Sequence, residues 1–202
     1  IAKGAQSAFA LCRPPGHHAT RATAMGFCLF NSVAVAAAHA VHEHGLHRVA
    51  IADFDVHHGN GSQDIFAGDP RVMYLSSHQS PLYPNTGDPA ESGVGNLANA
   101  TLAPGADSHA FRSVWQDQLL PRLEDFRPQL LLVSAGFDGH RLDPLADLAL
   151  EADDYRWLSA ELAGLAGRHA QGRLVSLLEG GYSLSALRAC SVAHVQGLLD
   201  AA

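Results

Sequence analysis

Short, uninterrupted apolar segments alternate along the chain with longer segments of helical periodicity. Apolar runs that lack the regular polar alternation of a half-exposed strand are typical of strands buried on both faces of a parallel sheet. Five segments have this pattern, at residues 7–12, 48–53, 72–76, 129–134 and 173–178, and residues 94–102 form a weaker sixth. The pattern therefore predicts a buried and mostly parallel sheet.

The segments between these strands have the spacing of helices. Helices are expected at residues 31–44, 108–126, 153–170 and 184–199. Either Asn31 or Ser32 can cap the first of them, because a side-chain oxygen there accepts a hydrogen bond from a free amide of the first turn. Strands that alternate with helices predict an α/β fold with three layers, in which an open, mostly parallel sheet is flanked by helices.

Composition narrows the class of protein. With 202 residues, of which 47% are hydrophobic and 16% charged, the chain can bury the core of a single globular domain spanning residues 1–202. The net charge of −7 argues against direct nucleic-acid binding through a broad basic face. No apolar run reaches the roughly 20 residues that cross a bilayer, so no membrane partner is expected.

Three further features of the sequence bear on the cellular compartment, the chemistry and the extent of the protein. The three cysteines are odd in number and form no CxxC pair, which favours free thiols in a reducing compartment, the cytoplasm. Thirteen histidines raise the question of metal or acid–base chemistry. The chain begins with Ile1 and its first apolar run follows almost at once, so we expect it to be the larger, C-terminal part of a longer protein.

Polar clusters follow four of the predicted strands. They lie at residues 13–18, 53–61, 136–138 and 179–182. Because ligands of an open α/β sheet bind beyond the carboxyl ends of its strands, we expect the four clusters to form one site.

The second cluster has the spacing of a metal site. Asp53, Asp55 and His57 alternate along extended chain, so their side chains point to one face. Carboxylate and imidazole are suitable ligands for Zn²⁺, and a catalytic zinc site takes three protein ligands and leaves one position open. Asp138 can join Asp55 and His57 as the third ligand. The alternative is that these acids are helix caps or turn residues.

The first and last clusters supply side chains that can transfer protons or donate hydrogen bonds. His17 and His18 are adjacent, and two imidazoles beside a metal can serve as general base and general acid. Tyr182 follows Gly180 and Gly181, which leave room for a substrate, and its phenol can donate to a developing oxyanion. By themselves, solvent-exposed histidines and a core tyrosine would be the simpler interpretations.

Taken together, these motifs resemble the zinc-dependent histone deacetylase family, which includes acetylpolyamine amidohydrolases and acetoin-utilisation proteins. The forms of the third and last clusters are similar to its class II and bacterial branch. The motifs that carry the resemblance lie, in the family's order, at residues 13–19, 26–31, 53–61, 136–138 with 143–144, and 179–182.

The resemblance implies an arginase-like fold with an eight-stranded parallel sheet, of which the strands and rim loops that precede residue 7 are missing. It implies that Asp55, His57 and Asp138 hold Zn²⁺. It also implies that Asp53 orients His17.

The same resemblance implies that Asn60 orients His18. Since Asp53 is an anion and Asn60 is neutral, we expect His17 to be charged and His18 to be the principal base and acid.

Further residues are assigned by the resemblance alone. Phe27 and Tyr83 match the aromatic pair that lines a narrow acyl-lysine channel, and Gly26 matches a residue that presents its carbonyl to the substrate. Gly180 and Gly181 belong to the substrate-binding set. The family also often has a K⁺ site, here near Asp53, Asp55, His57 and Ser76.

We therefore expect a zinc-dependent amidohydrolase that removes acetyl or other acyl groups from lysine side chains of proteins or from acetylated polyamines. A two-metal ureohydrolase would need carboxylates where Gly59 and His140 stand. A non-catalytic binding or scaffold module remains a second alternative. The substrate is the expected partner, and the oligomeric state stays open, a homo-oligomer included.

Overall fold

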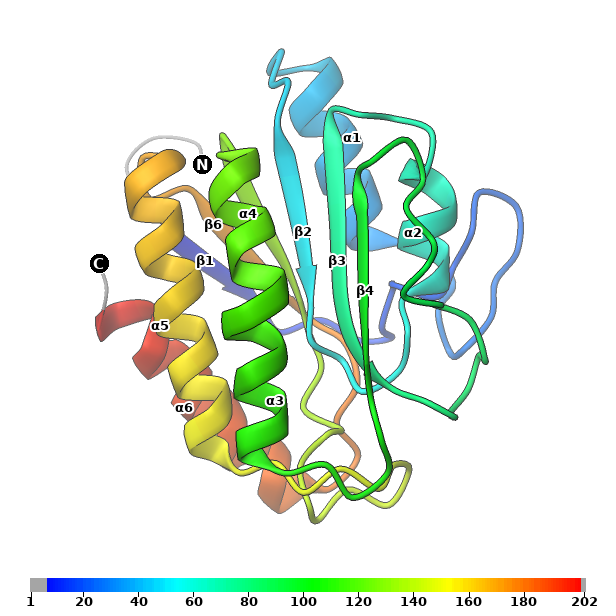
Figure 1. Ribbon diagram of the computed structural model, residues 1–202, viewed down its shortest axis with the longest axis vertical. Helices are drawn as coiled ribbons and strands as arrows, with labels where there is room; N and C mark the ends of the chain where they lie inside the picture. Colours follow the sequence, from blue (N-terminus) through cyan, green and yellow to red (C-terminus); the bar gives the residue numbers. More distant parts are fainter. Residues whose placement is uncertain (1–6, 201–202) are drawn as a thin grey trace.

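The sheet of the computed structural model, which describes residues 7–200, consists of six parallel strands (Figure 1). From one edge to the other their order is β1, β6, β5, β2, β3 and β4. Their bounds are β1 (Ser7–Ala10), β2 (Val49–Asp53), β3 (Val72–Gln79), β4 (Leu97–Leu102), β5 (Leu130–Ala135) and β6 (Leu174–Leu178). All six predicted strands are present, and the predicted α/β class is confirmed.

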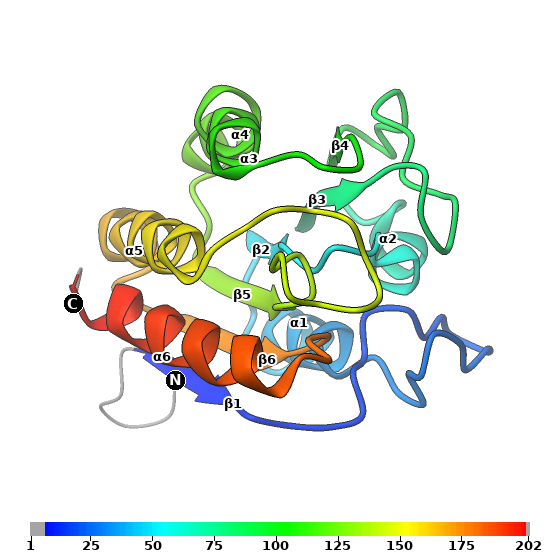
Figure 2. The same cartoon turned by 90° about the horizontal axis from the view of Figure 1, so that it is seen from below.

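The helices form a layer on each side of the sheet (Figure 2). Their bounds are α1 (Ser32–His42), α2 (Asn60–Phe66), α3 (Ser108–Val114), α4 (Leu120–Phe126), α5 (Ala152–His169) and α6 (Leu184–Asp200). Helices α1 and α2 cover one face, and α3 to α6 cover the other.

Strand β2 shows why the sheet needs both layers. Val49 and Ile51 pack with α1, whereas Ala50 and Ala52 pack in the core beneath α3 to α6. Successive side chains of a strand point to opposite faces, and helices cover both faces here. All five residues of the strand are therefore buried. This arrangement explains the apolar runs of the sequence.

The structure corrects the predicted elements in three places. Residues 60–66 form α2, a helix of seven residues that the sequence did not predict. Strand β3 continues to Gln79, three residues beyond its predicted end. The predicted helix 108–126 contains a π-helical turn, η1 (Trp115–Leu119), just before Pro121. Proline has no amide hydrogen and its ring crowds the preceding turn, so the wider turn accommodates it.

The cap of α1 lies at one of the two predicted positions. Asn31 is the N-cap, and its side chain accepts a hydrogen bond from the Ala34 amide at 3.0 Å. The neighbouring Ser32 is the first helical residue and is exposed.

Two expectations concern the described part of the chain, residues 7–200, as a whole. Six strands are seen of the eight that the resemblance implies. No helix between residues 7 and 200 combines the length and apolarity that a bilayer crossing demands.

Candidate active site

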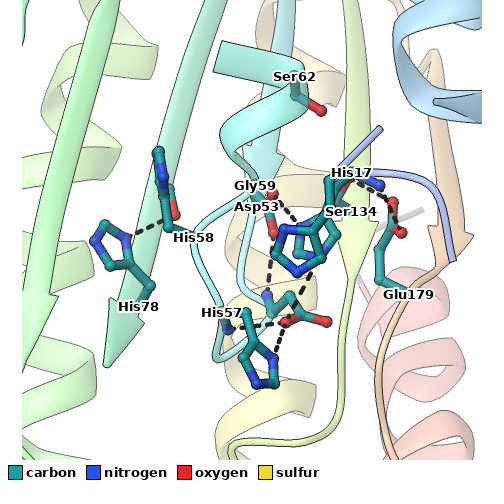
Figure 3. A network of polar contacts seen from close by, with 12 residues as sticks. His17, Asp53, His57, His58, Gly59, Ser62, His78, Ser134 and Glu179 are labelled. Atoms are coloured by element: carbon teal, nitrogen blue, oxygen red, sulfur yellow. Dashed lines mark hydrogen bonds and ion pairs between the residues drawn. The ribbon is translucent and has the colours of Figure 1, made fainter. Parts of the chain in front are cut away.

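The four polar clusters meet at the carboxyl ends of four neighbouring strands. His17 follows β1, Glu179 follows β6, Asp138 follows β5 and Asp53 ends β2, and these strands are adjacent in the sheet. Figure 3 shows that Glu179, His17 and Asp53 lie side by side although they come from distant parts of the chain. The strand order therefore assembles one site from the four clusters.

Asp55, His57 and Asp138 converge on one point of this site. Their potential ligand atoms all lie within 4.8 Å of one another. The Nδ1 atom of His57 is 3.1 Å from Oδ1 of Asp55 and 3.1 Å from Oδ2 of Asp138. These three residues are the ones that the sequence predicts as metal ligands.

The charge of this cluster fits a cation. Among residues 7–200, the ion-pair partners of the two buried carboxylates are histidines alone. Burial opposes the charging of His57, but hydrogen bonds and charges from Asp138 and Asp55 outweigh it and raise its pKa to about 10. Two carboxylates and one imidazole are a suitable ligand set for zinc with an open coordination position.

The backbone holds the two carboxylates in place. Asp138 accepts a hydrogen bond from the Val56 amide at 3.0 Å, and Asp55 accepts one from the Gly180 amide at 2.8 Å. A side chain at residue 180 would collide with the site, because a Cβ atom there would lie 2.0 Å from Oδ2 of Asp138. Gly180 is thus required by this close approach.

His17 is held through both its ring and its backbone. Its Nδ1 atom is 3.0 Å from Oδ2 of Asp53. Its amide and that of Gly16 donate to Oε2 of the buried Glu179, at 3.1 and 2.6 Å, and Ser134 donates to Oε1 of the same carboxylate at 2.9 Å. Figure 3 shows this arrangement. Glu179 therefore fixes the loop that carries the two histidines.

The surrounding carboxylates favour the charged form of His17. Burial lowers its pKa, but Asp53, Asp55 and Glu179 together outweigh burial and raise the pKa well above its ordinary value. Burial also raises the pKa of Glu179 to about 7, with the charges of Asp53 and Asp55 adding to the effect and that of His17 opposing it.

His18 has a neutral partner. Its Nδ1 atom is 2.8 Å from Oδ1 of Asn60, at the start of α2. Burial, together with the positive charge of His17, lowers the pKa of His18 to about 3. The ring is therefore neutral, and its Nε2 atom is not engaged by Asn60.

Tyr182 lies at the same pocket with its phenol protonated. Burial raises its pKa above the ordinary value, and the charges of Asp55 and Asp138 raise it further. The pocket that contains it is lined by both histidines, by two of the metal-site residues and by several apolar side chains: Pro15, His17, His18, Gly26, Phe27, Asp55, His57, Tyr83, Leu145, Gly180 and Tyr182.

Two aromatic side chains stand at the entrance of this pocket. Phe27 is 71% exposed and its ring centroid is 6.1 Å from that of Tyr182. Tyr83 is 43% exposed and its centroid is 5.2 Å from that of His18. Gly181, which the resemblance adds to the substrate-binding set, does not line this pocket, and its carbonyl accepts a hydrogen bond from Arg13.

Ser76, which the resemblance assigns to a K⁺ site, is buried at the end of the segment predicted as a strand. Its hydroxyl lies 3.0 Å from Nδ1 of His78. The K⁺ site stays a prediction.

The sequence analysis assigned no role to several residues that support the site. Tyr74 donates to Oδ2 of Asp53 at 3.0 Å and accepts from the Gly59 amide at 3.0 Å. Asp143 accepts from the Tyr182 amide at 2.7 Å, and Leu145 lines the pocket. Asp143 belongs to a recognised motif, but Tyr74 lies within an ordinary apolar strand and carries no signal in the sequence.

Comparison with known proteins places this geometry in a family. Residues 1–198 match the histone deacetylase domain. The chain belongs to the histone deacetylase family. Within this family, the chloroplastic histone deacetylase 14 of Arabidopsis thaliana is 45% identical over 195 residues, which are 95% of this chain and 46% of that protein.

A bacterial protein and a solved structure are also similar to this chain. The histone deacetylase-like amidohydrolase of Pseudomonas aeruginosa is 43% identical, and the match covers 98% of this chain and 53% of that protein. The crystal structure of the HDA15 HD domain matches with a TM-score of 0.89 and 38% identity, covering 96% of this chain and 55% of that chain. The chain spans about half the length of these relatives.

Proposed function

We propose that this protein is a zinc-dependent amidohydrolase that removes acetyl or other acyl groups from lysine side chains of proteins or from acetylated polyamines. The observation that carries the proposal is the convergence of Asp55, His57 and Asp138 at a pocket also lined by His17 and His18. Membership of the histone deacetylase family supports the reaction class.

In this proposal Asp55, His57 and Asp138 hold the metal ion. When bound, zinc polarises an amide carbonyl and lowers the pKa of a water molecule. His18, which is neutral beside Asn60, accepts the proton of the attacking water and passes it to the leaving amine.

Two other side chains stabilise the charge that develops on the carbonyl oxygen. Tyr182 remains protonated and donates its hydroxyl hydrogen to the developing oxyanion. His17, kept charged by Asp53, contributes a positive charge at the wall of the pocket.

The form of the pocket supports an acyl-lysine or acyl-polyamine substrate. Phe27, Tyr83 and Leu145 line it with apolar surface, which suits the alkyl chain of such a substrate. The net charge of −7 favours the approach of a cationic molecule.

Zinc analysis and hydrolysis assays on the complete polypeptide test this function. We expect one zinc ion per chain and release of acetate from an acetyl-lysine peptide or an acetylated polyamine. Asp138→Asn should lose both properties, because it removes a ligand, whereas the exposed Asp64→Asn on α2 should keep both. Hydrolysis that persists in Asp138→Asn would refute the mechanism.

The two alternatives predict different outcomes of the same assays. A scaffold module would bind partners without hydrolysing any acyl-amide. A ureohydrolase would bind two metal ions, but residues 7–200 contain a single group of three metal-ligating side chains, and Gly59 and His140 stand where further carboxylates are needed. We therefore favour the one-metal amidohydrolase.

We also propose a cytoplasmic location, on the basis of the three cysteines, which are free in the structure. The relative from Arabidopsis is named as chloroplastic, so a fluorescent fusion of the complete polypeptide is the direct test.

A further inference from the structure

The segment that carries Tyr182 is fixed on one side by a buried carboxylate. Oδ2 of Asp143 accepts hydrogen bonds from the amides of Tyr182 and Ser183, at 2.7 and 3.2 Å. Asp143 is buried, and Tyr182 and Ser183 are half-buried. These bonds fix the amides of residues 182 and 183, but they contact neither the Gly181 carbonyl nor the phenol ring.

Arg13 supplies a contact to each of these two groups. Its Nη2 atom donates to the Gly181 carbonyl at 2.6 Å, and its guanidinium carbon lies 5.4 Å from the centroid of the Tyr182 ring. The second distance is within the range of a cation–π contact. Arg13 follows β1 and Tyr182 follows β6, and these strands are neighbours in the sheet.

The peptide that joins Gly181 to Tyr182 is held at both of its polar groups, the carbonyl by Arg13 and the amide by Asp143. Gly181 has a φ of +125°, a conformation that side-chain-bearing residues rarely adopt, and glycine itself permits many others. Rotation of this peptide would move the attached Tyr182 ring. A guanidinium group can both donate to the carbonyl and lie against the ring face, because it is planar and carries several donors.

We propose that Arg13 is a positioning residue for Tyr182, which it holds with its hydroxyl directed at the position of the substrate carbonyl. The catalytic consequence rests on the proposed amidohydrolase function. The positional part does not, because it concerns the order of one side chain in the folded protein.

A double-mutant cycle tests the catalytic consequence in the complete polypeptide. We expect Arg13→Met to lower kcat about tenfold with KM changed less than about twofold, because a small misplacement of a reacting group is costly. Tyr182→Phe should lower kcat by about a hundredfold or more. In the Tyr182→Phe background, Arg13→Met should change kcat by less than about twofold.

Two further variants separate positioning from charge and from general damage. Arg13→Lys keeps the charge and a donor but cannot lie flat on the ring, so it should recover only part of the lost kcat. Arg48→Met is the matched control, because Arg48 is also exposed and donates to a backbone carbonyl, that of Arg127, at 2.9 Å. We expect the control to retain the wild-type kcat.

Two kinetic results would overturn the proposal. One is an equal loss of kcat from Arg13→Met in the wild-type and Tyr182→Phe backgrounds, which would show that Arg13 acts independently of Tyr182. The other is a rise in KM alone, which would show that Arg13 acts on the substrate.

A spectroscopic measurement tests the position of Tyr182 without any activity. Tyrosines are replaced by 3-fluorotyrosine, and the ¹⁹F resonance of Tyr182 is identified by its loss in Tyr182→Phe. Arg13→Met should shift or broaden this resonance and leave that of the buried Tyr74 unchanged. An unchanged Tyr182 resonance would refute the positioning role. A wild-type protein that hydrolyses no acyl-amide would refute the proposed function, while this spectrum would still decide the role of Arg13.

Discussion

His17 and His18 are adjacent in the chain, yet their rings have different partners. His17 faces the carboxylate of Asp53 at 3.0 Å, and His18 faces the neutral amide of Asn60 at 2.8 Å. The difference follows from the elements that supply the partners, since Asp53 ends β2 and Asn60 begins α2. Two identical side chains thereby acquire opposite preferences for a proton.

This difference predicts unequal effects of the two alanine substitutions. His18→Ala should lower kcat/KM by about 10²–10⁴-fold, the usual contribution of a general base and acid. His17→Ala should cost less, because His17 contributes charge without transferring the proton. Steady-state kinetics on an acetyl-lysine peptide provide the measurement, and a larger loss from His17→Ala would reverse the assignment.

Helix α1 is fixed at its start by one polar side chain. Asn31 is buried, accepts from the Ala34 amide, and donates through Nδ2 to the Ala19 carbonyl at 3.0 Å and to Oγ of Ser62 at 3.1 Å. Its contacts connect α1 to α2 and to the loop that follows the two histidines. The cap is therefore also a tertiary contact.

Removing this side chain should destabilise the protein measurably. Asn31→Ala loses the cap and leaves buried partners without hydrogen bonds, so we expect the free energy of unfolding to fall by about 2 kcal/mol. The adjacent Ser32→Ala is the matched control, because Ser32 is exposed and should change stability by less than about 0.5 kcal/mol. Urea denaturation measures both, and equal stabilities of the two variants would contradict the role of the cap.

At the scale of the whole molecule, one buried imidazole outside the candidate site connects three elements. His194 of α6 lies 2.6 Å from Oγ of Ser159 in α5 and 2.8 Å from Oγ of Ser176 in β6. Burial lowers the pKa of His194 to about 4. Two helices and a strand thus meet at a histidine that is neutral at physiological pH.

This histidine predicts a loss of stability in mild acid. The unfolded chain takes up a proton near pH 6.5, whereas the folded protein does so only near pH 4, so acid stabilises the unfolded state first. Between pH 7 and pH 5 the protein should lose about 2 kcal/mol through His194, at about 1.4 kcal/mol per pH unit below 6.5.

His194→Gln keeps hydrogen-bonding groups but cannot be protonated in this range. Its free energy of unfolding should therefore fall about 2 kcal/mol less than that of the wild type between pH 7 and pH 5. Urea denaturation at the two pH values compares the proteins. Equal losses, or an NMR titration of His194 near pH 6.5 in the folded state, would contradict the prediction.

Much of the local structure could be predicted from the sequence because it depends on neighbouring residues. Apolar runs predict all six strands, and the acceptor side chain of Asn31 predicts the start of α1. The sequence predicts that Asp55 and His57 lie on one face of extended chain. The two side chains do converge, but from a bend that follows β2, in which the His57 amide donates to Oδ1 of Asp55 at 2.9 Å. Helix α2 and the π-helical turn before Pro121 escaped prediction, because short elements carry few periodic positions.

The sequence by itself determined the fold class, the candidate metal ligands and the resemblance to a family, all of which depend on residue type and spacing along the chain. Only the tertiary structure decided that β1, β6, β5 and β2 are neighbours, which brings Glu179 to the amide of His17 and Arg13 to Tyr182. The physical reason is that strand order is set by the packing of crossover helices on the two faces of the sheet. Contacts between residues more than 160 positions apart leave no periodic signal in the chain.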